Sequence, residues 1–327
     1  MVNQFKSNRP YNNFLLLIYG VVILWALFAK SINIENKTSA DFLFTVFKNM
    51  KIIAEHNKFP ASFYVFILLF VQALVINQIA IKQKLFPKIN YLTGMCFLLF
   101  SSLFINKIEM SSALTVSPML LWVLSKICGL QNVSDSKKNL FNIGLVIGIA
   151  TLIFQPAIIF LFVILFALLI TRPFRLTEWV VLIIGGLTPY YFIASWLFLS
   201  GRPIMHLIPS LQINIPTFTF NVWETSAGIL ILLTLLNSIY NIHVNMRKLL
   251  VQSRDSWTII FFYFFIACFV PFFSPSTDHS TWIFILSPAA IIAAATFLYI
   301  NQKWLVVFLH WVLVVLSFVI AYFYMLK

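Results

Sequence analysis

Residues 61–90 read ASFYVFILLFVQALVINQIAIKQKLFPKIN. An uncharged apolar run over 61–81 is followed by a short loop that carries Lys82, Lys84 and Lys88. A run of about 20 apolar residues has the length that an α-helix needs to cross the hydrocarbon core of a bilayer. Helix is expected there because a segment in lipid must satisfy its own backbone hydrogen bonds. The stretch therefore predicts a membrane-spanning helix that ends in a basic loop.

The same unit, an apolar run followed by a short polar loop, recurs along the whole chain. The pattern predicts an all-α, polytopic transmembrane helical bundle of about 11 spans, built as a single integral membrane domain over residues 1–327. The expected spans cover residues 14–29, 61–81, 91–106, 111–128, 139–154, 156–171, 178–199, 226–241, 257–274, 281–300 and 304–325.

Composition excludes a soluble globular protein. Hydrophobic residues make up 61% of the chain, charged residues only 9%, and the mean hydropathy is +0.96. So few charges cannot cover the surface of a protein in water, so lipid is the expected solvent. The net charge of +13 lies in short loops between apolar runs. That placement indicates membrane topology and contact with anionic lipids, and we expect no nucleic-acid partner.

The distribution of Lys and Arg orients the chain. With a cytoplasmic N-terminus, the inner segments carry 14 of the 22 basic residues and only three acids, whereas the outer segments carry eight bases and six acids. The positive-inside rule then predicts a bacterial inner (cytoplasmic) membrane protein with its N-terminus in the cytoplasm and its C-terminus in the periplasm. The inner segments are 1–13, 82–90, 129–138, 172–177, 242–256 and 301–303.

Two spans, 139–154 and 156–171, are short, and the sequence leaves two interpretations of them open. Gln155-Pro156 is either a tight outer turn between two spans or a break in one long helix, and the second interpretation would invert everything downstream. Basic clusters that follow at 172–175 and 247–254 favour the turn.

Two outer segments are long enough to have structure of their own. Residues 30–60 hold Thr38 and Asp41 at capping-box spacing, followed by apolar residues at helical period, which predicts an amphipathic surface helix that ends near Pro60. Residues 200–225 contain three prolines and a short alternating stretch, which favours extended structure on the membrane surface.

Polar residues within the spans are few and uncharged. They are Gln72, Asn77, Asn237 and His310, for which we predict interhelical hydrogen bonds. Ion-coupled transporters usually keep charged groups at such depth, so their absence argues against that class. The five histidines and three cysteines show no metal-ligand spacing, and we predict no metal and no cofactor.

The polar residues that remain gather on the expected outer face. For any one of them, a solvated loop position is the ordinary interpretation. They are Glu35, Asp41, Glu109, Arg202, His206, Glu224, Asp278 and His279.

Three stretches resemble the membrane-embedded glycosyltransferases of the C superfamily fold. NIGLVIGIA at 142–150 is similar to their glycine-spaced helix, and TDHS at 277–280 with LSPAA at 286–290 resembles their late outer loop and proline-containing helix. A long first outer loop with an acid, Asp41, also fits their architecture, although Ala40 and Phe42 flank Asp41 where those enzymes usually carry a second acid nearby.

This resemblance implies a transferase that uses polyprenyl-phosphate-linked sugar or lipid at the periplasmic face. Asp41 would be the catalytic general base towards an acceptor hydroxyl. Cationic side chains would hold the lipid phosphate. The implied substrate-binding residues are Arg202, His206, Asp278 and His279.

A second resemblance is to an uncharacterised multi-pass inner-membrane family of Bacteroidota. It is carried by RPFRLTEW at 172–179 and GGLTPY at 185–190, and it implies an inner-membrane location without an activity. Pro189 in this stretch is expected to bend the seventh span, because proline removes a helix donor.

Three functions follow as hypotheses. The protein is a transferase for lipid-linked sugar at the outer face, a non-catalytic membrane subunit or scaffold in envelope assembly, or a transporter or flippase. The first two rank about level and the third ranks behind them.

Overall fold

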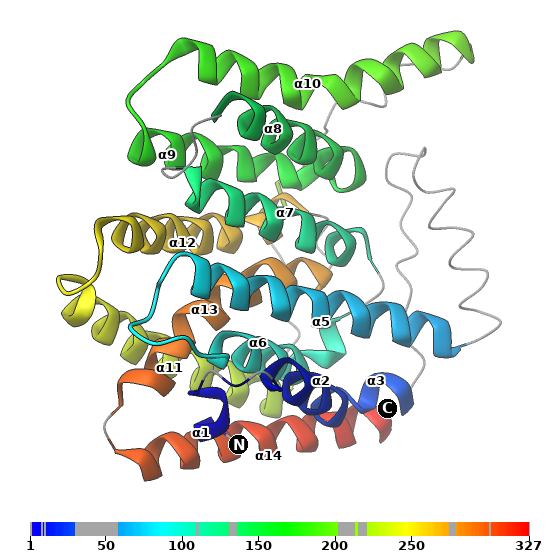
Figure 1. Cartoon of the computed structure of the whole chain (residues 1–327). Helices are drawn as coiled ribbons and strands as arrows, with labels where there is room; N and C mark the ends of the chain where they lie inside the picture. The colour runs from blue at the N-terminus through cyan, green and yellow to red at the C-terminus, as the bar shows by residue number, and fades with distance from the viewer. Residues whose placement is uncertain are drawn as a thin grey trace.

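A computed structural model describes residues 2–7, 9, 11–29, 58–108, 111–130, 136–201, 213–214, 221–274, 279–300 and 302–326 (Figure 1). Regular structure in these residues is helical throughout. The helices are α1 (Val2–Phe5), α2 (Asn12–Ile23), α3 (Ala26–Ala29), α5 (Lys58–Lys82), α6 (Leu92–Leu103), η1 (Ile105–Lys107), α7 (Ser112–Cys128), α8 (Ser136–Ile153), η3 (Gln155–Phe160), α9 (Leu161–Thr171), α10 (Leu176–Leu199), α11 (Val222–Met246), α12 (Val251–Phe269), η5 (Val270–Phe273), η6 (His279–Trp282), α13 (Ile283–Tyr299) and α14 (Lys303–Leu326).

The all-helical class is confirmed, and the chain is a membrane protein. Each of the expected apolar segments is helical in the structure. Six stretches are long and apolar enough to cross a membrane, and four further apolar helices are shorter. The total of 11 crossings and their orientation remain predictions. The six are Pro60–Lys82, Leu176–Leu199, Val222–Met246, Val251–Phe273, Ser280–Tyr299 and Trp304–Phe323.

Two expectations for the N-terminal part change or stay open. The first expected span is not one continuous helix, because α2 ends at Ile23 and α3 begins at Ala26. The N–H groups of Leu27 and Phe28 donate to carbonyls three residues back, so the chain tightens there into a 3₁₀-like turn. The predicted surface helix lies outside the described residues, and Pro60 lies in the first turn of α5.

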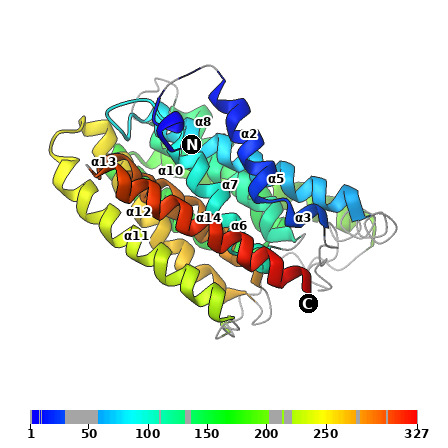
Figure 2. The ribbon, with the colours of Figure 1, turned by 90° about the horizontal axis from the view of Figure 1, so that it is seen from below.

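The centre of the bundle is α6, every residue of which is buried. It packs against α2, α5, α13 and α14, and α13 in turn packs against α11 and α12. Figure 2 shows α14 running along the face of the bundle, with α11 at one side of it and α2 at the other. Side chains therefore fill the middle of the bundle.

Helix α8, which contains the glycine-spaced stretch 142–150, packs closely against α10. This is the most extensive helix–helix contact among the described residues. A Cβ added at Gly144 would lie 2.3 Å from the carbonyl oxygen of Leu182, and one at Gly148 would lie 2.4 Å from that of Gly186. A Cβ at Gly185 would lie 2.4 Å from the carbonyl oxygen of Phe141. The two backbones thus touch, as small residues allow between membrane helices.

Pro189 lies inside α10, as expected from the sequence. Figure 1 shows α10 bent near its middle. Proline leaves the carbonyl of Gly185 without its helical donor, which accounts for the bend. The hydroxyl of Thr188 donates to the carbonyl of Ile184 at 2.7 Å and stabilises the adjacent turn.

The described residues of the six segments predicted to be cytoplasmic lie together at one end of the bundle, which we call the basic end. The N–H of Tyr91 donates to the carbonyl of Phe5 at 2.8 Å, and Gln252 donates to the side chain of Gln83 at 3.0 Å. A Cβ on Gly129 would lie 3.5 Å from the side-chain nitrogen of Gln83. Tyr299, just before segment 301–303, lines one pocket with Lys88 and Lys248.

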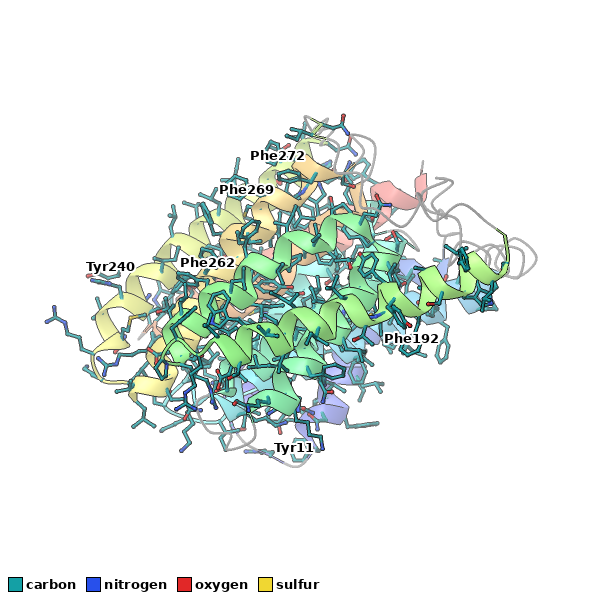
Figure 3. All side chains as sticks on the ribbon, turned by 90° about the horizontal axis from the view of Figure 1, so that it is seen from above. Tyr11, Phe192, Tyr240, Phe262, Phe269 and Phe272 are labelled. Atoms are coloured by element: carbon teal, nitrogen blue, oxygen red, sulfur yellow. The ribbon has the colours of Figure 1, made fainter. Side chains whose placement is uncertain are left out.

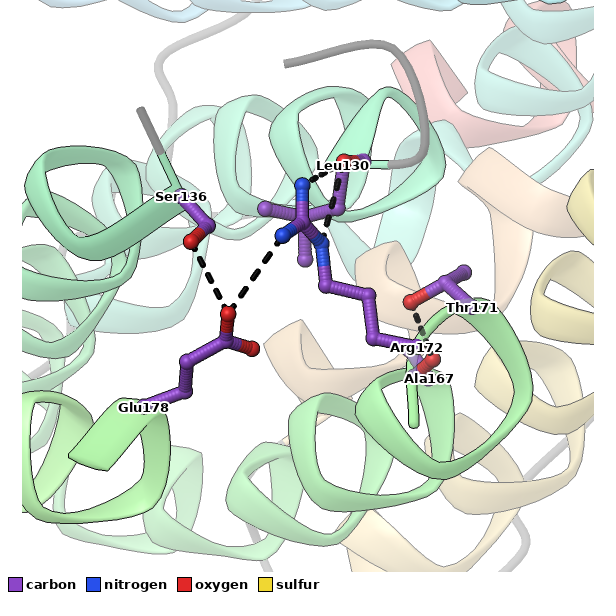
Figure 4. A network of polar contacts seen from close by, with 6 residues as sticks. All are labelled: Leu130, Ser136, Ala167, Thr171, Arg172 and Glu178. Atoms are coloured by element: carbon purple, nitrogen blue, oxygen red, sulfur yellow. Dashed lines mark hydrogen bonds and ion pairs between the residues drawn. The ribbon is translucent and has the colours of Figure 1, made fainter. Parts of the chain in front are cut away.

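A buried ionic junction places segments 129–138 and 172–177 together at this end (Figure 4). Arg172 donates to the carbonyl of Leu130 through Nε at 3.2 Å and through Nη2 at 2.5 Å, and its Nη1 lies 3.4 Å from Oε1 of Glu178. The hydroxyl of Ser136 donates to the same carboxylate oxygen at 2.9 Å. We call these four residues the Arg172 junction.

The Arg172 junction distinguishes the two interpretations of residues 139–171, a turn between two helices and a break in one long helix. One continuous helix of about 35 residues would separate Ser136 from Arg172 by about 50 Å. Both residues instead contact Glu178. The chain therefore reverses at Phe154, whose backbone is extended, and at η3, so the tight-turn interpretation of Gln155-Pro156 is confirmed.

The surface of the bundle is apolar and aromatic. Few residues of α10 and α11 are buried: 17% and 28% of their apolar stretches, respectively. Figure 3 shows Phe192 projecting from α10 and Tyr240 from α11, away from the rest of the bundle. Large exposed side chains of this kind fit contact with lipid tails and interfaces.

The four polar residues for which interhelical hydrogen bonds were predicted differ in outcome. Gln72 accepts from Ser117 at 2.8 Å, and Asn77 accepts from Thr93 and from the N–H of Gly94, so interhelical hydrogen bonding is confirmed for both. For Asn237 and His310, the prediction of interhelical hydrogen bonds is wrong. Asn237 is exposed and accepts from Asn241 in its own helix, and the imidazole of His310 stacks on Tyr19.

Candidate functional site at the end opposite the basic loops

At the opposite end of the bundle, which we call the outer end, described parts of several other connections pack together. The N–H of Asn214 donates to the carbonyl of Phe272 at 2.8 Å, and η3, η5 and η6 pack in sequence against one another. This end is where the sequence places the acid-rich segments.

The sequence-predicted site residues fall outside what the structure describes. Asp41, Arg202, His206 and Asp278 lie outside the described residues, and His279 is described only as the first residue of η6. The structure therefore neither brings these side chains together nor separates them. Among the outer polar candidates, Glu224 is the one whose side chain is described.

Glu224 lies in the first turn of α11 and is buried. Its Oε2 accepts from the N–H of Asn221 at 3.4 Å, which satisfies a backbone donor that the start of a helix leaves free. A carboxylate is also favourable there because the N-terminus of a helix carries partial positive charge. The local sequence thus explains why an acid can be held at this depth.

Lys107 is the partner of Glu224. It is the last residue of η1, a single turn that follows α6, and its Nζ lies 4.0 Å from Oε2 of Glu224. The side chains are 11% and 3% exposed, so the pair lies at the edge of the apolar core rather than in bulk solvent. An ion pair in such a place requires both partners, since either charge alone would be costly to bury.

A small cavity adjoins Lys107. Its volume is about 10 Å³, and its wall includes Ser280 and Trp282 from η6 together with Leu114 from α7. A space of about this size holds about one water molecule. A sugar or lipid substrate would therefore need surfaces beyond these residues.

Three separate chain segments thus meet at the outer end, through Lys107, Glu224 and Ser280. Sequence reasoning treated Lys107 only as a loop charge and missed its pairing. A usable signal was present, because Lys107 directly follows the third expected span and Glu224 shortly precedes the eighth, at the same membrane boundary. Opposite charges at the same membrane boundary attract and can form an ion pair.

Metal and thiol chemistry find no support in the described part of the chain. No group of three His, Cys, Asp or Glu side chains comes together there. The three cysteines are free, and Cys96 and Cys128 are buried.

Comparison of the chain with protein-family models, with curated proteins and with solved structures gave no match.

Proposed function

We propose that this membrane protein is a transferase of the glycosyltransferase-C type that handles polyprenyl-phosphate-linked sugar or lipid at the periplasmic face. The observation that carries the proposal is the buried Lys107–Glu224 pair at the outer end, beside Ser280. In the sequence, Lys107 is two residues before Glu109, and Ser280 directly follows Asp278 and His279. Cationic donors at one membrane boundary are suited to the oxygens of a phosphate-bearing lipid.

In this proposal the roles follow the chemistry of each residue type. Asp41 removes the proton of the acceptor hydroxyl as its oxygen bonds to the sugar's anomeric carbon, and the bond from that carbon to the phosphate oxygen breaks, so that polyprenyl phosphate leaves. Arg202, His206 and His279 offer donors to the lipid phosphate, and Asp278 orients them. Lys107 and Glu224 join η1 to the start of α11 at the outer end. No metal or cofactor takes part in the proposed scheme.

Replacement of Asp41 tests the catalytic assignment. In a strain that lacks the gene, Asp41→Asn is expected to abolish complementation, because loss of a general base typically lowers the rate about 10²–10⁴-fold. Membrane abundance of the variant, measured by immunoblot, should equal that of the parent. Glu35→Gln is the matched control, since it removes another acid from the same loop and should complement fully. Full complementation by Asp41→Asn would remove the catalytic role.

A scaffold or subunit in envelope assembly is the second candidate, and the surface of α10 favours it. Ile183, Leu187 and Phe192 are all more than half exposed on this helix. Such a face packs against lipid or against a partner helix. A stable protein that co-purifies with the parent but is lost on Ile183→Ser, while Asp41→Asn still complements, would favour the scaffold.

A further inference from the structure

A hollow lies at the basic end of the bundle. Its volume is about 540 Å³. The walls are the end of α5 with the loop that follows it, the turn between α11 and α12, and the last residue of α13. A hollow of this size is within the usual range for small-molecule sites.

Three lysines line this pocket: Lys84, Lys88 and Lys248. All three are exposed, no Asp or Glu is among the described residues of the wall, and no described acid forms an ion pair with them. Three ammonium groups around one hollow repel one another unless an anion lies between them. The pocket is therefore electrostatically suited to an anion.

Two other polar side chains of the wall are already used by the fold. Asn90 donates to the carbonyl of Lys88 and accepts from the N–H of Leu92, where it caps the start of α6. Asn245 donates to the carbonyl of Asn241 at 2.8 Å. The three lysines and the hydroxyl of Tyr299 remain as donors with capacity for a ligand, and ammonium groups suit phosphate oxygens.

The backbone of Lys84 gives a second, independent observation. Its φ is +49°, and it is the one residue other than glycine with positive φ among those described. The N–H of Leu85 donates to Ala80 and that of Lys84 to Ile81, which is the pattern that closes a helix with a left-handed residue. Glycine normally takes this position, because a side chain there costs about 1 kcal/mol.

Strain of this kind is retained where the side chain has a use. The hydroxyl of Ser253 donates to the carbonyl of Lys84 at 3.0 Å and holds the strained turn against α12. The strained residue is thus fixed by the fold and carries one of the three ammonium groups of the pocket.

The rest of the pocket is apolar and opens beside lipid-facing surface. Its wall includes Phe86, Ile89 and Leu250, and the last two are about half exposed. A ligand with a phosphate and an apolar portion would match both parts. Basic pockets between membrane helices at the cytoplasmic side are typical sites for anionic lipid headgroups.

We propose that the pocket formed by Lys84, Lys88 and Lys248 binds the phosphate group of an anionic membrane lipid. This site is separate from the proposed transferase site and does not depend on it. Each lysine is expected to contribute about fivefold to affinity, which corresponds to about 1 kcal/mol for a basic residue at an anionic membrane surface.

Binding to the purified full-length protein in neutral detergent tests the proposal. The probes are short-chain phosphatidylglycerol, phosphatidylcholine of the same chain length, and glycerol phosphate. The parent should prefer phosphatidylglycerol. The triple variant Lys84→Gln/Lys88→Gln/Lys248→Gln should bind it about 100-fold more weakly. The matched triple Lys82→Gln/Lys137→Gln/Lys138→Gln removes the same charge from exposed lysines of the basic end that do not line the pocket, and it should bind within about twofold of the parent.

A single substitution separates binding from folding. Lys84→Gly should raise the midpoint of thermal unfolding without lipid, because it relieves the positive φ, and it should weaken lipid binding about fivefold. Equal loss of binding in both triple variants would overturn the site, as would equal affinity for phosphatidylcholine. Binding of glycerol phosphate as tight as that of the lipid would support a phosphate site but would contradict its assignment to a lipid.

Discussion

Gly148→Ala should lower the free energy of unfolding by about 3 kcal/mol, at the upper end of the usual cost of overpacking. The new methyl group would lie 2.4 Å from the carbonyl oxygen of Gly186 and 3.1 Å from the ring of Pro189. Backbone atoms cannot swing aside as a flexible side chain can, so α8 and α10 must separate. Because this is the most extensive helix contact of the fold, separation should also lower the amount of protein recovered.

Neighbouring glycines supply the controls. Gly185→Ala should behave like Gly148→Ala, since its Cβ would lie 2.4 Å from the carbonyl oxygen of Phe141. At Gly186 the nearest atom would be 3.7 Å away, and at Gly228 no atom lies within 4 Å. Alanine at these two positions should leave stability unchanged or raise it by up to about 1 kcal/mol, because alanine is the better helix former. Thermal unfolding in detergent measures the series, and equal midpoints for the alanine variants of Gly148 and Gly186 would contradict the close contact.

Arg172→Ala is expected to cost about 3 kcal/mol, the lower end of the range for removing one partner from a buried pair. Glu178 would keep its bond from Ser136 but would lose its cationic partner in a site where it is 4% exposed. The carbonyl of Leu130 would lose both donors that Arg172 supplies. The ends of α7, α8 and α9 would no longer be joined at the basic end.

The control for this prediction is three residues further along the chain. Arg175→Ala removes an exposed arginine from the same loop and should change stability by no more than about 0.5 kcal/mol. Arg172→Lys should recover only part of the loss, since an ammonium group does not form the fork that reaches both Leu130 and Glu178. In a double-mutant cycle, Arg172→Ala and Glu178→Ala should together cost less than the sum of the two. Strict additivity would show that the junction contributes nothing.

Hydropathy and charge located the helices but not their neighbours. Each apolar segment proved helical, and the basic clusters after 156–171 correctly favoured a turn at Gln155-Pro156. Exposure was not readable from hydropathy, because lipid and protein interior are similarly apolar. The apolar stretches of α10 and α13 have mean hydropathies of 1.7 and 2.0, yet only 17% of the first is buried against 83% of the second.

The positions of small residues indicate which helix faces are buried against other helices, which hydropathy does not. The run 289–295 in α13 is rich in alanine and is fully buried, and the glycines of α8 lie against α10. Both follow the rule that small side chains let membrane helices approach closely. The polar residues Asn237 and His310 were misjudged because a sequence does not show which face of a wholly apolar helix meets protein.

The candidate site could be predicted from sequence only as a region. Charge counting placed the acid-rich segments at the outer end, and Glu224 is described there. Its pairing with Lys107 joins residues far apart in the chain, which depends on how the helices pack. The pocket at the basic end shows the same limit, because Lys84, Lys88 and Lys248 resemble ordinary topology signals until the fold puts them around one hollow.

Sidedness of the two ends is the most direct test of the account. In a background where Cys96, Cys128 and Cys268 are replaced by serine, single cysteines are placed at Lys88, in the basic end, and at Ser200, at the far end of α10. A membrane-impermeant maleimide applied to intact spheroplasts should label Ser200→Cys at once and Lys88→Cys only after the membrane is opened. Labelling of both positions in intact spheroplasts, or of Lys88→Cys alone, would contradict the account.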